Sequence, residues 1–142
     1  MTTIDFYFNA ADRLQVACRL AGKALAAGER LVVYAPEVEL ASRVDRLMWT
    51  WPATGFVPHC APDDPLAPDT PVLIARDEQA PPGCHVLLNL GSEAPPHFAR
   101  FERLLEVVGR DDADKEAGRL RYRAYKARGY AIANHDLAAS DG

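Results

Sequence analysis

The side chains best suited to binding chemistry lie in one short segment, KEAGRLRYRAYKARGY, over residues 115–130. This segment holds six basic residues against a single acid, Glu116, although the whole chain of 142 residues has a formal net charge of −4. The rest of the chain therefore carries about −9. A cationic segment on an otherwise acidic protein is typical of a surface that meets an anionic partner.

Helical spacing arranges these cations around an aromatic ring. Lys115, Arg119, Tyr122 and Lys126 fall on one face of a helix, and Arg123 borders that face. Few acids lie one turn away to neutralise the cations. Two interpretations stay open from charge alone: a solvated helix face with extended cationic side chains, or a binding surface for an anion.

The opposite side of the same helix predicts how it packs. Ala117, Leu120 and Ala124, followed by Tyr125, form a face that we expect to lie against the rest of the protein. Gly118 interrupts the helix at a cost of about 1 kcal/mol relative to alanine, which would let the backbone of a partner approach closely.

An anionic guest could be nucleic acid or an acidic peptide. A long phosphate backbone would meet repulsion from the acidic remainder of the chain, which argues against direct nucleic-acid binding. A short peptide with a terminal carboxylate fits better, because arginine clamps a carboxylate with two hydrogen bonds and lysine adds a point charge. We therefore favour an acidic peptide, with direct binding of single-stranded nucleic acid as the alternative.

No motif for catalysis or a cofactor was found. The turn after the first expected strand reads NAAD over 9–12, without the glycines or lysine that hold phosphate at a helix N-terminus. No G-x-S-x-G nucleophile motif is present either. The sequence predicts a protein that is not an enzyme and that has no cofactor.

The cysteines do not indicate a disulfide framework or a metal site. Cys18, Cys60 and Cys84 are few and scattered. Two of them adjoin histidines, in the pairs His59-Cys60 and Cys84-His85, whereas structural zinc sites use ligands separated by a few residues. We expect reduced thiols and no bound metal.

Alternating strand and helix patterns predict the fold. We expect strands over 4–9, 30–35, 71–75 and 85–90, and helices over 11–27, 37–50, 94–108 and 115–128. This alternation predicts a single α/β domain over 1–130, a three-layer αβα Rossmann-like arrangement with a mostly parallel sheet, followed by a flexible tail over 131–142. No apolar run approaches the length of a membrane span and no signal peptide is evident, so we expect a cytoplasmic protein.

Three segments resemble one known family. They are K-x-L-x-x-G-x-x-L-V-V over 23–33, LMWTWPATGFVPH over 47–59, and K-x-x-x-R-x-R-Y-R-A-Y-x-x-x-G-Y over 115–130. Their order and spacing are similar to those of the chi subunit of bacterial DNA polymerase III, an accessory subunit of the clamp-loader complex. The resemblance implies an α/β protein that supports DNA replication without being an enzyme.

The resemblance also implies two partners. The acidic C-terminal tail of single-stranded DNA-binding protein would be held by Lys115, Arg119, Tyr122 and Trp49, with Arg123 as an additional cation. The psi subunit of the clamp loader would dock at Phe56, although a phenylalanine in a proline-rich loop more often fills a core.

Overall fold

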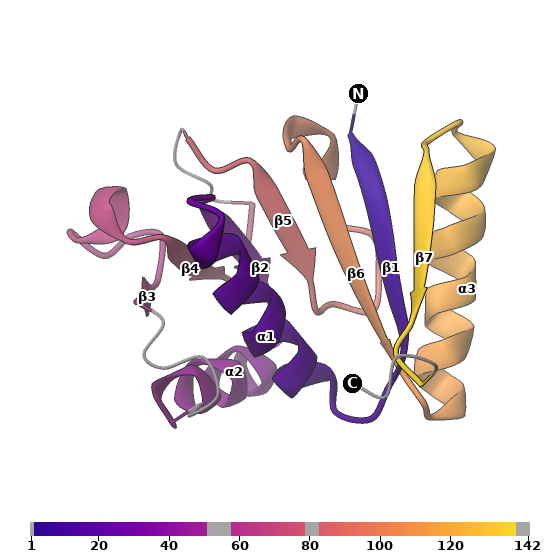
Figure 1. Cartoon of the computed structure of the whole chain (residues 1–142), viewed down its shortest axis with the longest axis horizontal. Helices are drawn as coiled ribbons and strands as arrows, with labels where there is room; N and C mark the ends of the chain where they lie inside the picture. The colour runs from indigo at the N-terminus through magenta and orange to yellow at the C-terminus, as the bar shows by residue number, and fades with distance from the viewer. Residues whose placement is uncertain (1, 51–57, 79–82, 139–142) are drawn as a thin grey trace.

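The computed structural model describes residues 2–50, 58–78 and 83–138 (Figure 1). Its centre is a seven-stranded parallel sheet with the order β3-β4-β2-β5-β6-β1-β7. Helices cover both faces, which confirms the predicted three-layer α/β fold. The strands are β1 (Thr3–Ala10), β2 (Leu31–Tyr34), β3 (His59–Cys60), β4 (Val72–Ala75), β5 (Val86–Asn89), β6 (Arg103–Gly109) and β7 (Ile132–Asp136).

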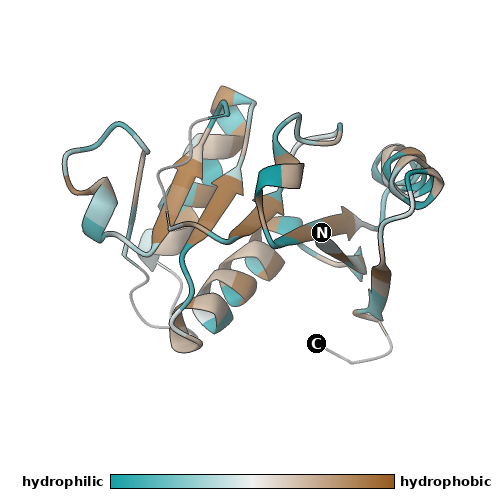
Figure 2. Cartoon of the chain, turned by 90° about the horizontal axis from the view of Figure 1, so that it is seen from above, coloured by the Kyte–Doolittle hydropathy of each residue, from teal (hydrophilic) through white to brown (hydrophobic). Residues whose placement is uncertain are grey.

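Two helices cover one face of the sheet and the third covers the other. Helices α1 (Arg13–Ala26) and α2 (Val38–Thr50) share a hydrophobic core with β2, β4 and β5. Helix α3 (Asp112–Ala127) packs on the opposite face through a second core that includes Phe6, Phe98 and Tyr125. The strands are largely hydrophobic, whereas α3 is largely hydrophilic, as expected for a helix with one face in solvent (Figure 2).

Carboxylates define where two of these helices begin. Asp12 Oδ1 accepts hydrogen bonds from the backbone nitrogens of Leu14 and Gln15, at 3.0 and 3.2 Å, and so caps α1. Asp111 Oδ1 accepts from Asp114 N at 2.8 Å and caps α3. The start of the cationic helix therefore follows from the aspartates that precede it.

The helix predicted over 94–108 is wrong. The chain there forms a short 3₁₀ turn, η2 (Phe98–Arg100), and then β6, which lies between β5 and β1. A strand buried on both faces carries an unbroken apolar run, and such a run also contains the residues that a helical period would require. In RLLEVVG of β6 the residues Leu104, Leu105 and Val108 also fit a helical period, and Glu106 interrupts the apolar run.

The sheet also extends beyond residue 130. Residues Ile132–Asp136 form β7, which runs parallel to β1 with Ile4 opposite Ile132 and Phe8 opposite Asp136. This strand lies within the stretch 131–142 for which we predicted a flexible tail. Its sequence, IANHD, is polar because an edge strand can leave half its side chains in solvent, so the pattern did not indicate a strand.

In the loop between α2 and β4, η1 (Ala67–Asp69) and β3 complete the described elements.

Candidate functional site

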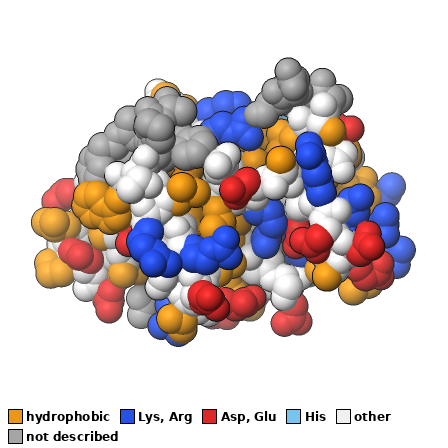
Figure 3. Space-filling model, turned by 90° about the horizontal axis from the view of Figure 1, so that it is seen from below, with side chains coloured by type: hydrophobic (Ala, Val, Ile, Leu, Met, Phe, Trp, Pro, Cys, Tyr) orange, Lys and Arg blue, Asp and Glu red, His pale blue; other side chains and the backbone are white. Residues whose placement is uncertain are grey.

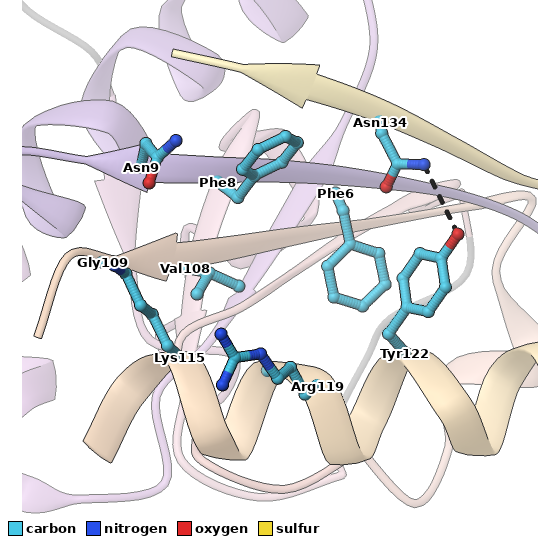
Figure 4. Close-up of a pocket in the computed structure, with 10 residues that line it drawn as sticks. Phe6, Phe8, Asn9, Val108, Gly109, Lys115, Arg119, Tyr122 and Asn134 are labelled. Carbon is cyan, nitrogen blue, oxygen red and sulfur yellow. Dashed lines mark hydrogen bonds between the residues drawn. The ribbon is translucent and has the colours of Figure 1, made fainter. Parts of the chain in front are cut away.

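A pocket of about 340 Å³ lies between α3 and the strands β1, β6 and β7 (Figure 4). Phe6 and Phe8 come from β1, Val108 from β6, Asn134 from β7, and Lys115, Arg119 and Tyr122 from α3. Asn9, Gly109 and Gly118 complete the lining. The structure thus brings three of the predicted tail-binding residues, Lys115, Arg119 and Tyr122, to one hollow.

The interior of the pocket is apolar because strand alternation directs alternate residues of β1 toward α3. Phe6 is buried there, with its ring edge-on to Tyr122 at a centroid separation of 5.3 Å. Phe8, two residues on, lies on the same face and packs against the same core. An apolar side chain of a ligand would find aromatic and aliphatic partners in this slot.

The structure explains why a glycine stands at position 118, within a helix. A Cβ placed on it would lie 2.9 Å from Val108 Cγ2 and 3.1 Å from Val108 Cγ1. The glycine therefore lets α3 approach β6 closely, and so sets the width of the slot between them.

The cations stand at one end of the slot. Lys115 and Arg119 are one turn apart on α3 and both line the pocket (Figure 4). Arg119 Nη1 is 3.8 Å from Glu116 Oε2, but both side chains are more than 60% exposed, and such a pair contributes well under about 1 kcal/mol. Within 2–50, 58–78 and 83–138, Lys115 makes no ion pair. Both groups are available to an anion.

The predicted inner face of α3 is correct at Tyr125 and wrong at Leu120 and Ala124, which are exposed. Leu120 is 56% exposed, whereas the helix buries Gly118, Arg121 and Tyr125. Arg121, only 3% exposed, donates from Nε to Glu106 Oε1 at 3.0 Å and from Nη1 to the main-chain oxygen of Ser92 at 2.8 Å. The sequence did not indicate that Arg121 is buried, because its partner Glu106 lies within a largely apolar segment that was not recognised as a strand.

Glu106 is the centre of a buried polar network. Its carboxylate accepts hydrogen bonds from Tyr125 Oη at 2.6 Å and from Asn89 Nδ2 at 3.1 Å, in addition to Arg121. Burial raises the pKa of Glu106, and the charge of Arg121 opposes that shift. Burial and the neighbouring Glu106 carboxylate raise the pKa of Tyr125, so its hydroxyl stays a donor. The network fixes α3 to β5 and β6, and so positions the cations of its outer face.

Three other predicted residues lie elsewhere. Trp49 belongs to α2, on the opposite face of the sheet from α3, where it is 59% exposed and its ring lies 5.0 Å from that of His59. Arg123 is exposed on α3 beside Tyr122 but does not line the pocket. Phe56 falls outside the described residues. The structure does not bring Trp49 into the site with Lys115 and Arg119.

The pocket also contains residues that were not predicted from the sequence. Phe8, Asn9 and Val108 belong to the ends of β1 and β6, and Asn134 to β7. Alternating aromatic residues in the first strand were a usable signal for Phe8. Val108 and Asn134 could not be assigned to a pocket wall while their strands were predicted as a helix and a tail.

The edge of the sheet where α/β proteins bind nucleotides is filled by the chain's own groups. The Arg13 guanidinium donates to the main-chain oxygens of Leu90 and Val107, at 3.0 and 3.2 Å, and lies 3.4 Å from Asp114 Oδ2. Asp12 occupies the N-terminus of α1, where a phosphate would otherwise bind.

The described part of the chain contains no cluster of three or more His, Cys, Asp or Glu side chains suited to a metal ion. Nor is any helix within it long and apolar enough to span a bilayer.

Comparison with known proteins decides the family. A family model described as "DNA polymerase III chi subunit, HolC" matches residues 1–133. The chain belongs to the DNA polymerase III chi subunit family. Chi-family relatives include the DNA polymerase III subunit chi of Pseudomonas aeruginosa, 36% identical, with 96% of this chain and 98% of the relative covered.

Two further relatives carry the same name. The subunit chi of Escherichia coli is 26% identical over 83% of this chain and 81% of its own length. The subunit chi of Haemophilus influenzae is 25% identical over 87% of this chain and 86% of its own length. The family resemblance drawn from the sequence is confirmed, and this chi-family chain has an accessory role in the replisome.

Proposed function

We propose that this chi-family chain is a non-catalytic replisome adaptor that binds the acidic C-terminal tail of single-stranded DNA-binding protein and docks to the psi subunit of the clamp loader. The observation that carries the first half is the placement of Lys115 and Arg119 at one end of an apolar slot lined by Phe6, Phe8 and Tyr122. Family membership supports both halves.

The slot suits the end of a peptide chain. The Arg119 guanidinium would clamp the terminal carboxylate, and Lys115 would add a second positive charge. A hydrophobic last side chain would enter between Phe6, Phe8 and Val108, and Arg123 would attract acids further back. A free carboxylate beside a hydrophobic side chain is what the site requires, and this combination occurs at a chain terminus.

The remaining site predictions rest on the family resemblance. Trp49 lies beyond the other face of the sheet from the slot, so a tail seated at Arg119 would have to pass around the edge of the sheet to touch it. We keep Trp49 as a tail-binding prediction and Phe56 as a psi-binding prediction, each testable by single substitution.

A non-catalytic role fits the filled edge of the sheet. Asp12 accepts from the backbone N–H groups of Leu14 and Gln15, which a nucleotide phosphate would otherwise use, and the Arg13 guanidinium is already bonded to two main-chain carbonyls. In this proposal the protein acts in the cytoplasm with its replisome partners and contacts nucleic acid only indirectly.

Titration calorimetry with an acidic peptide that ends in a hydrophobic residue and a free carboxylate tests the proposal. We expect micromolar affinity for the parent protein and at least tenfold weaker binding for Arg119→Ala, which is about 1.4 kcal/mol. Arg76→Ala is the matched control, because Arg76 is an exposed arginine directly after β4, far from the pocket in the sheet order. Equal binding by all three proteins would refute the tail site.

A second assay separates the adaptor from the alternative function. A direct binder of single-stranded nucleic acid would retain a labelled oligonucleotide at low salt, whereas the adaptor would retain it only through added single-stranded DNA-binding protein. Binding of oligonucleotide by the chain alone, lost in Arg119→Ala, would favour the alternative.

A further inference from the structure

Arg110 lies at the rim of the tail pocket, immediately after β6. Its Nε donates a hydrogen bond to the main-chain oxygen of Asn9 at 3.2 Å, and Asn9 and Gly109 both line the pocket. Arg110 is exposed and, among the residues that the structure describes, makes no ion pair. An arginine is thus held next to the pocket with its two terminal nitrogens directed to no carboxylate.

The residue that anchors Arg110 is itself in an unusual conformation. Asn9 has φ of 62°, the sole positive value among the described residues other than glycine, and the pairing of β1 with β6 shifts register between Tyr7 and Ala10. Asn9 Nδ2 also donates to Asp136 Oδ1 of β7 at 2.9 Å. Asparagine adopts this left-handed region more readily than most residues, and the contacts with Asp136 and Arg110 hold Asn9 in it.

Three acidic side chains around the contact between Arg110 and Asn9 have other partners. Asp111 caps α3, and Asp114 accepts a hydrogen bond from Gly109 N and pairs with Arg13. Asp136 accepts from Asn9 and from Ala138 N. Asp112, exposed in the first turn of α3, is the acid left to compete. On the face at the carboxyl ends of the strands, lysine and arginine side chains are interspersed with acidic side chains (Figure 3).

We propose that Arg110 is a further peptide-binding residue of this pocket, which holds a carboxylate of the bound tail upstream of its terminal carboxylate. This inference rests on the proposed function, in which Lys115 and Arg119 take the terminus. The bond to Asn9 uses only one of the five guanidinium donors, so the others remain for the peptide. It also restrains the side chain before binding, which lowers the entropy lost on association.

The pocket would then distinguish among chain termini. A hydrophobic last residue with a free carboxylate would satisfy the slot and Arg119, and an acid close before it would satisfy Arg110. Arg110 therefore adds specificity for acidic tails over neutral tails that end in the same residue.

A double-mutant cycle on the full chain tests the assignment. Two synthetic peptides share a hydrophobic last residue with a free carboxylate, and they carry either aspartates or asparagines upstream. We expect Arg110→Ala to bind the aspartate peptide three- to tenfold more weakly than the parent, and to bind the asparagine peptide as the parent does. Arg110→Glu should weaken the aspartate peptide further and strengthen a third peptide that carries lysine upstream.

The outcomes separate this inference from the function beneath it. Equal binding of the aspartate peptide by Arg110→Ala and the parent, with loss in Arg119→Ala, overturns the role of Arg110 and leaves the tail site standing. No loss in Arg119→Ala overturns the tail site itself. Equal losses of Arg110→Ala for both peptides would also contradict the inference, because Arg110 would then act through the fold and not through the upstream acid.

Discussion

Arg119 and Arg121 are two residues apart on one helix and have opposite environments. Arg119 is exposed at the mouth of a pocket, with one distant acid at 3.8 Å, whereas Arg121 is buried and bonded to Glu106 at 3.0 Å. One lies in the aqueous interface and the other in the core between α3 and β6. The comparison shows that a run of like charges need not form one functional unit: here one cation fixes the helix and its neighbours remain available to bind.

The largest difference between the two arginines should appear in stability. Arg121→Ala leaves Glu106 buried without its cation, and such a change costs about 3–5 kcal/mol. Arg119→Ala removes an exposed side chain and should change the free energy of unfolding by no more than about 0.5 kcal/mol. Urea unfolding of both variants measures the difference, and similar losses for the two would contradict the division of roles.

Substitution by lysine should affect peptide binding at Arg119 and stability at Arg121. Arg119→Lys keeps the charge but loses the two-point clamp, so we expect acidic-peptide affinity to fall roughly three- to tenfold with stability unchanged. Arg121→Lys should lower stability instead, because lysine cannot reach Glu106 and the Ser92 carbonyl with the same fork. Calorimetric titration paired with thermal unfolding distinguishes the two; a fall in stability for Arg119→Lys would argue against its role at the pocket.

Gly118 tests whether the contact between the helix and the sheet sets the pocket. Gly118→Ala gains helix propensity of about 1 kcal/mol but meets Val108, an overpacking cost of about 1–3 kcal/mol. We expect a net destabilisation of about 1 kcal/mol and weaker peptide binding as α3 moves away from β6. The double variant Gly118→Ala with Val108→Ala should recover part of the stability, and no recovery would mean that the clash lies elsewhere.

The smallest expected difference between the exposed cations and the buried Arg121–Glu106 pair is their response to salt. Raising ionic strength from 0.05 to 0.5 M weakens the attraction between exposed charges, so peptide affinity should fall several-fold. The stability lost in Arg121→Ala should be nearly the same at both salt concentrations, because buried pairs are screened less. Unfolding curves at the two ionic strengths measure the stability loss, and titrations at the same ionic strengths measure the peptide affinity.

Part of this arrangement could be predicted from sequence alone. Helical spacing placed Lys115, Arg119 and Tyr122 on one face, although α3 begins at Asp112, three residues before the predicted start. The period could not tell which other face is buried, because that depends on Glu106, an acid on a strand whose apolar run also fitted a helix. Asn134 was missed for a related reason: a polar edge strand has no apolar alternation to reveal it.

The most direct test of the central claim compares one acidic peptide in two forms, with a free and with an amidated C-terminus, by titration calorimetry against the parent protein. If Lys115 and Arg119 hold the terminal carboxylate, the amide should bind at least tenfold more weakly, and the difference should shrink in Arg119→Ala, where only Lys115 remains. Equal affinity for the two forms in the parent protein would contradict the account.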